Sequence, residues 1–180
     1  NLPQSVRFKK ENVILVGLMP GPKEAKTSEI NLYRRPLVDK LEKLYKGVRV
    51  QTYQYPNGTT IHAALFIVAC NIPAAQKVCG FTSHISTNTC HKCNHQFSRL
   101  AGTSSVYYSG FDFSKWLLCT KNDNCKDAEI WRSATTEAER HCLEVENGVC
   151  WSKLHCLQYF DVVHCTIIDL MHNLFLGTAK

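Results

Sequence analysis

The feature that most constrains this chain is the stretch of residues 63–93, AALFIVACNIPAAQKVCGFTSHISTNTCHKC. An apolar run ends there at Asn71, and the Cys-x-x-Cys pair Cys90 and Cys93 begins nineteen positions later. Many α/β enzymes place a metal-binding or catalytic group on a polar side chain at the end of a buried strand. The cysteine pair beyond it indicates an insertion held by zinc. The amide of Asn71 stands where a metal-dependent nuclease requires a carboxylate.

Length and composition indicate a globular chain. Its 180 residues suffice for one domain with a core, or for one domain with an insertion. Hydrophobic residues make up 44% and charged residues 20%, which argues against disorder, and no run reaches the roughly 18 apolar residues of a membrane span. The net charge of +6 is compatible with nucleic acid, although the basic residues are scattered and a solvated surface is the simpler explanation. The start at Asn1, without a secretion leader, and the end after an apolar run indicate a fragment of something longer.

The ten cysteines leave two interpretations of the cellular compartment. An even and high cysteine count is typical of secreted scaffolds built on disulfides. Cys70 and Cys165, however, lie inside apolar runs, as buried thiols do. Reduced thiols in an intracellular protein therefore fit better.

Local patterns in the first half predict a helix followed by two strands. Leucines recur at helical spacing after Pro36, and Gly47 is a typical helix end. Residues 48–55 and 60–70 predict consecutive strands, joined by a turn at 56–58.

The second half is less regular. Residues 81–128 are rich in Ser, Thr, Asn, Gly and Cys and show weak periodicity, which indicates an irregular insertion. Thr136 and Glu139 form a capping-box pattern that predicts a helix to about Asn147. The apolar run 167–176 is helix-like.

Two groups of side chains could carry chemistry. Cys90 and Cys93 have the spacing that brings two thiolates to one tetrahedral ion, and His84 is a candidate further zinc ligand. Unmetallated packing cysteines and a redox pair remain alternatives. Asp169 and His172, three residues apart, share one face of a helix and could bind metal or transfer protons. A capping Asp beside a surface His is the simpler explanation of that pair.

The chain resembles CACTA-type (En/Spm-like) DNA transposases, and their fungal relatives in particular. The resemblance spans nearly the whole chain, and the stretches that carry it are MPGPKE at 19–24, INLYRRPLVDKL at 30–41, ALFIVACNIPA at 64–74, GFTSH at 80–84, CHKC at 90–93 and DLMHNLFLG at 169–177. It implies a ribonuclease-H-like core in which three acidic residues hold two Mg²⁺ or Mn²⁺ ions. It also implies DNA cleavage and strand transfer at transposon ends, in the nucleus.

The position that matches the family's second catalytic Asp is Asn71. The first and third acids would lie outside this chain, whereas Cys90, Cys93, Asp169 and His172 match the family's Cys-x-x-Cys and Asp-x-x-His motifs. A neutral amide oxygen should greatly weaken the binding of two cations. The resemblance therefore predicts a fragment of a transposase that has lost catalysis.

Several cysteines and histidines fall where the resemblance leads us to expect arginine. A single C-to-T transition, on one DNA strand or the other, converts CGN arginine codons to Cys or His codons, and transitions of the same kind convert Asp to Asn. We interpret these residues as marks of cytosine deamination in a decaying copy, and not as ligands; they are Cys119, Cys142, Cys150, Cys156, His62, His95 and His164.

The resulting expectation is an α/β fold. A partial ribonuclease-H-like core would span residues 1–80, a helical and irregular Cys-x-x-Cys insertion 81–160, and a helix with the Asp-x-x-His motif 161–180. The alternative function is a domesticated binding module, held by zinc, that contacts DNA or protein without catalysis. No membrane association is expected, and the sequence does not indicate an oligomeric state.

Overall fold

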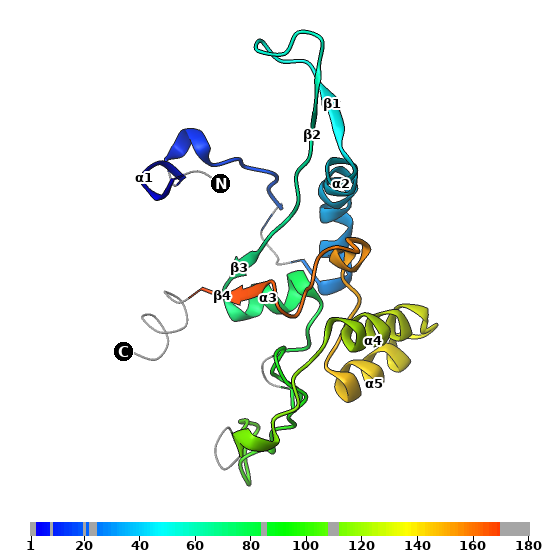
Figure 1. Cartoon of the computed structure of the whole chain (residues 1–180). Helices are drawn as coiled ribbons and strands as arrows, with labels where there is room; N and C mark the ends of the chain where they lie inside the picture. Colours follow the sequence, from blue (N-terminus) through cyan, green and yellow to red (C-terminus); the bar gives the residue numbers. More distant parts are fainter. Residues whose placement is uncertain are drawn as a thin grey trace.

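A computed structural model of the chain describes residues 3–7, 9–19, 21, 25–83, 86–107 and 112–169. These residues form helices and two small two-stranded sheets, which agrees with the predicted α/β class (Figure 1). The longer helices are α2 (Thr27–Lys46), α3 (Ile72–Cys79), α4 (Lys121–Ser133) and α5 (Glu137–Asn147). The strands are β1 (Val48–Val50), β2 (Thr59–Ile61), β3 (Val68–Cys70) and β4 (Thr166–Ile168). Short helical turns are α1 (Gln4–Arg7), η1 (Lys10–Asn12), η2 (Phe113–Lys115) and η3 (Lys153–Cys156).

The longest element, α2, begins nine residues before Pro36, so the predicted helix start is wrong. The backbone N–H of Lys26 donates to the Glu29 carboxylate at 2.8 Å, which closes the first turn there. Pro36 lies inside the helix, where it removes one backbone donor without ending the element. Gly47 ends the helix as predicted, because its φ of 101° suits glycine.

The predicted pair of strands after α2 forms only in part. β1 and β2 pair antiparallel, with Val48 opposite Ile61 and Val50 opposite Thr59, and the hairpin extends beyond the end of α2 (Figure 1). The second predicted strand, 60–70, is divided into β2 and β3. Residues 62–67, which include two alanines of low strand propensity, separate the two.

The second sheet joins segments about a hundred residues apart. β3 and β4 are parallel, in a register that places Val68 opposite Thr166 and Cys70 opposite Ile168. Ile167 and Ile168 therefore lie in a strand and not in the helix expected over 167–176; from residue 170 that helix lies outside the described residues.

The core lies where α2 and α3 meet the segment that leads into β4. Val38 of α2 and Cys79 of α3 are fully buried. They pack with the other buried members of one cluster: Phe81, Leu154, Leu157, Phe160, Val162 and Val163. Leu41, one of the leucines at helical spacing after Pro36, packs against this cluster and is half-buried. This packing positions β4 beside β3.

The region between α3 and β4 consists of irregular chain and two packed helices. Thr136 accepts a hydrogen bond from Glu139 N at 3.1 Å, and Gly148 follows the last turn with φ 72°. The predicted boundaries of this helix, α5, are therefore confirmed. α4 packs beside α5, as Figure 1 shows. All ten cysteines are free thiols, which gives no support to a disulfide scaffold.

One apolar segment lies almost entirely in solvent. Residues 13–19 form neither helix nor strand, and Ile14 and Leu18 are 83% and 81% exposed. No helix among the described residues has the length and hydropathy needed to cross a membrane.

Candidate functional site

Two of the predicted site residues meet at the carboxyl edge of the small parallel sheet. Asn71 follows the last residue of β3, and Asp169 follows the last residue of β4. Since Cys70 is paired with Ile168, the two polar residues are neighbours in register. The backbone N–H of Asp169 donates to the carbonyl oxygen of Cys70 at 3.0 Å, which fixes this juxtaposition. Parallel α/β sheets bind ligands at this edge.

Asn71 also has a structural role. Its Oδ1 accepts a hydrogen bond from the backbone N–H of Ala74 at 2.9 Å, and its φ of −67° and ψ of 166° are those of a helix N-cap. The side chain is exposed and uses its only carbonyl oxygen to satisfy the first turn of α3. The amide therefore offers little to a cation at the sheet edge.

The donor set at this edge does not fit a pair of divalent cations. Mg²⁺ and Mn²⁺ sites that hold substrate phosphates rely on several anionic oxygens. Among the described residues, the edge supplies the carboxylate of Asp169 and the amide of Asn71. His172, the other half of the Asp-x-x-His motif, lies outside the described residues. The described part of this edge therefore has the geometry of a strand-end site but supplies one carboxylate, which is less charge than two cations need.

The Cys-x-x-Cys loop lies at the opposite end of β4. Lys92, between the two cysteines, donates through Nζ to the carbonyl oxygens of Val163 and Thr166, the latter at 2.9 Å. Thr166 is the first residue of β4, whereas Asp169 follows its last residue. The structure thus separates the cysteine loop from the two strand-end residues.

His91 completes the contact between this loop and the sheet. Its ring packs against Phe81, with centroids 4.9 Å apart, and lies close to the backbone of Thr166. Burial, with a smaller contribution from the neighbouring Lys92, lowers the pKa of His91 to about 4. The imidazole is therefore neutral at pH 7 and serves as a packing group.

Asp161 closes the turn that precedes β4. Its Oδ1 accepts from the backbone N–H groups of Val163 and His164, at 2.9 and 3.0 Å. Its Oδ2 lies 2.8 Å from Nδ1 of His164. Partial burial opposes ionisation of Asp161, but the hydrogen bonds from His164 and Val163 outweigh it and hold its pKa below the usual value.

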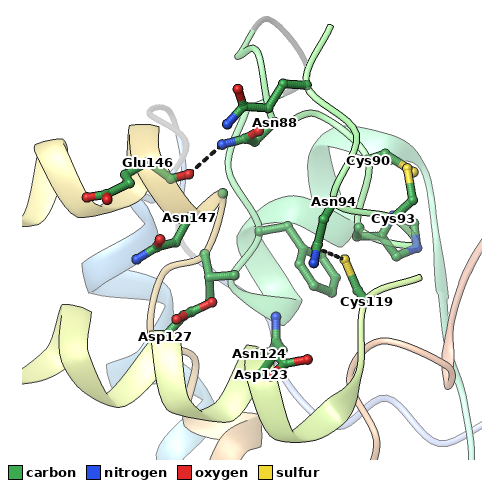
Figure 2. A pocket seen from close by; sticks show the side chains of 15 residues that line it. Asn88, Cys90, Cys93, Asn94, Cys119, Asp123, Asn124, Asp127, Glu146 and Asn147 are labelled. Carbon is green, nitrogen blue, oxygen red and sulfur yellow. Dashed lines mark hydrogen bonds between the residues drawn. The ribbon is translucent and has the colours of Figure 1, made fainter. Parts of the chain in front are cut away.

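A cavity of about 220 Å³ lies between the cysteine loop and helices α4 and α5 (Figure 2). Cys90, Cys93 and Cys119 line one part of it, and the acids Asp123 and Asp127 line another. Figure 2 shows Cys119 near the Cys90–Cys93 pair, although it was predicted to be a mutational scar. No sequence spacing indicates this approach, because it depends on the pairing of Cys93 with Leu118.

Burial raises the pKa of two of the thiols at this cavity, Cys119 and Cys90. Burial, and secondarily Cys93 and Cys90, raises the pKa of Cys119 to about 11, and its Sγ donates to Asn94 Oδ1 at 2.8 Å. Burial also raises the pKa of Cys90. A raised pKa argues against Cys90 acting as a nucleophile or as the attacking thiol of a redox pair.

The predicted zinc site is incomplete in the described part of the chain. His84 lies outside the described residues. Elsewhere in the ranges that the structure covers, no three His, Cys, Asp or Glu side chains converge to hold a metal ion. Two cysteines fill half of a tetrahedral site, so zinc remains a prediction.

A family described as "Transposase family tnp2" matches residues 1–147, which is most of the chain. No curated protein and no solved structure matches.

Proposed function

The chain belongs to the tnp2 family of transposases, and we propose that it descends from an enzyme that cleaved and joined DNA but no longer catalyses that reaction. The observation that carries the proposal is the pair formed by Asn71 and Asp169 at the ends of β3 and β4. The geometry of a strand-end site is present, and one of its two side chains is a neutral amide that caps α3.

The finer assignment rests on the resemblance of the motifs. Their order and spacing support a CACTA-type (En/Spm-like) element with fungal relatives. The parallel pair β3 and β4, with α3 following β3, is compatible with part of a ribonuclease-H-like core. In an intact relative, Mg²⁺ or Mn²⁺ would act in the nucleus at transposon ends.

Loss of catalysis is tested with a matched pair of proteins. The chain and its Asp169→Ala variant are incubated with supercoiled plasmid DNA and either Mg²⁺ or Mn²⁺, and nicked product is measured. We expect the two proteins to give the same background, because one carboxylate cannot hold two cations. Nicking by the unsubstituted chain above the Asp169→Ala background would contradict the proposal.

The role of position 71 is tested separately with Asn71→Asp. One carboxylate oxygen can still cap α3, and the other is available beside Asp169. We therefore expect Mn²⁺ to bind this variant more tightly than the unsubstituted chain, as measured by electron paramagnetic resonance of free Mn²⁺. Equal affinities would show that the two strand ends do not form a cation-binding pair.

A non-catalytic binding module, held by zinc, is the second candidate. It is favoured by the anchoring of the cysteine loop through Lys92 at the start of β4, the end of that strand away from Asp169. Elemental analysis should then give one zinc per chain, and a Cys90→Ser, Cys93→Ser double variant should give none. A zinc content that the double substitution leaves unchanged would exclude this assignment of the ligands.

A further inference from the structure

The turn of the β1–β2 hairpin presents two tyrosines that contribute nothing to the core. Tyr53 is fully exposed and Tyr55 is 56% exposed. The turn that carries them is closed, because Thr52 N donates to Tyr55 O and Tyr55 N donates to Thr52 O, at 3.2 and 3.1 Å. Tyrosine is enriched at interfaces because its ring is apolar and its hydroxyl is polar, so exposed tyrosines in a closed turn suit a binding surface.

The same part of the chain concentrates positive charge. Residues 43–62 contain Lys43, Lys46 and Arg49 and no Asp or Glu, a net charge of +3 in 20 residues against +6 for all 180. All three side chains are exposed. Within the described part of the chain, Lys43 and Lys46 have no ion-pair partner. Their charge is therefore available to an anionic ligand.

The helix end and the hairpin are fixed to each other. β1 starts one residue after Gly47, and the backbone N–H of Ala63 donates to Leu44 O at 3.1 Å. Nδ1 of His62 lies 3.2 Å from the carbonyl oxygen of Tyr45. The hairpin therefore extends from α2 in a defined direction (Figure 1). Cations on the last turns of α2 and tyrosines at the hairpin tip lie on one projecting structure.

We propose that this projecting structure contacts DNA that carries unpaired bases, and we call it the hairpin surface: Lys43, Lys46, Arg49, Tyr53 and Tyr55. The cations lie against phosphates, and the ring of Tyr53 stacks on a base outside the duplex. The inference rests on the proposed function, since a transposase meets DNA ends. It goes beyond it by assigning the contact to a hairpin away from the strand-end residues Asn71 and Asp169.

The test measures affinity of the full chain for a labelled forked duplex and for a fully paired duplex of the same sequence, by fluorescence anisotropy at several salt concentrations. Tyr53→Ala should weaken binding to the forked duplex by roughly five- to a hundredfold, and binding to the paired duplex less. The matched control is Tyr107→Ala, which removes another exposed ring (47% exposed). It should leave both affinities unchanged.

The charge is tested with the double variant Lys43→Gln, Lys46→Gln. The slope of log affinity against log salt should fall by about 1.8, which is about 0.9 for each lost phosphate contact. The control Lys10→Gln, Lys126→Gln removes the same charge elsewhere and should keep the slope.

The outcomes distinguish failure of the hairpin surface from failure of the proposed function. If the unsubstituted chain binds DNA and the hairpin variants match their controls, the hairpin surface is overturned while the proposed function stands. If the unsubstituted chain binds neither duplex, the DNA contact of the proposed function fails, and the hairpin inference fails with it.

Discussion

Replacing Lys92 by methionine tests how the cysteine loop supports the strand-end site. The Lys92 ammonium donates to Val163 O and, at 2.9 Å, to Thr166 O, and it lies 3.5 Å from His164 O. Val163 and Thr166 are at most 1% exposed, so loss of the donor leaves carbonyl groups of buried residues poorly satisfied. Methionine keeps most of the aliphatic stem and removes only the charge and the donors.

The expected loss in the free energy of unfolding is about 1.5–3 kcal/mol, the range for hydrogen bonds to a charged group. It does not reach the sum of the separate bonds, because burial already lowers the pKa of Lys92 and penalises its charged form. Urea denaturation of the full chain, followed by tryptophan fluorescence, measures this difference. Lys126→Met, which removes an exposed lysine, is the control and should change stability by less than about 0.5 kcal/mol.

Hydrogen exchange shows where in the chain the Lys92→Met substitution acts. The amide hydrogen of Asp169 is protected by its bond to Cys70 O across the β3–β4 pair. If Lys92 anchors the start of β4, Lys92→Met should accelerate exchange of this hydrogen by roughly ten- to a hundredfold. The anchoring role of Lys92 is refuted if Lys92→Met and Lys126→Met have the same stability and the same exchange rate at Asp169.

Three further predictions concern single residues. Asn71→Ala should lower the unfolding free energy by about 1 kcal/mol, because the N–H of Ala74 loses its cap, and Asn71→Asp should not; equal losses in urea denaturation would rule out the capping role. Gly80→Ala should lower the free energy of unfolding by roughly 2–4 kcal/mol, because φ of Gly80 is +80° and a Cβ there would collide with Cys150 O. A smaller change in thermal unfolding would contradict this geometry. The pKa of Asp161 is lower in the folded than in the unfolded state. The ionised carboxylate therefore stabilises the fold above about pH 3.9, and this stabilisation is lost as pH falls through the folded-state pKa. Asp161→Asn should therefore flatten the acid limb of the stability profile, and an unchanged limb would show that other groups produce it.

Features set by a few neighbouring residues could be predicted from the sequence. The helix α5 has its predicted boundaries because Thr136 and Gly148 act within one turn of its ends. The stop of α2 at Gly47 has the same local cause. The predicted start of α2 was wrong. The pattern of leucines placed the first turn of the helix at Pro36, whereas the hydrogen bond between Lys26 and Glu29 closes the first turn.

The arrangement of the candidate site depends on contacts between distant residues, which local patterns do not contain. The position of Asn71 at a strand end was expected, but its pairing with Asp169 results from the β3–β4 register. The approach of Cys119 to Cys93 likewise depends on a single bridge between remote segments. The anchoring role of Lys92 was missed, since a lysine between two cysteines gives no sign of the carbonyl groups that it reaches.

The exposed apolar run at residues 13–19 has a practical consequence for handling this protein. It is an apolar stretch without a charged side chain, and its backbone takes part in neither sheet. Such a segment can pair with the same segment of another molecule, as uncovered strands do in aggregates. We expect concentrated preparations to self-associate through this run, and a Leu15→Lys substitution to keep the protein dispersed in light scattering.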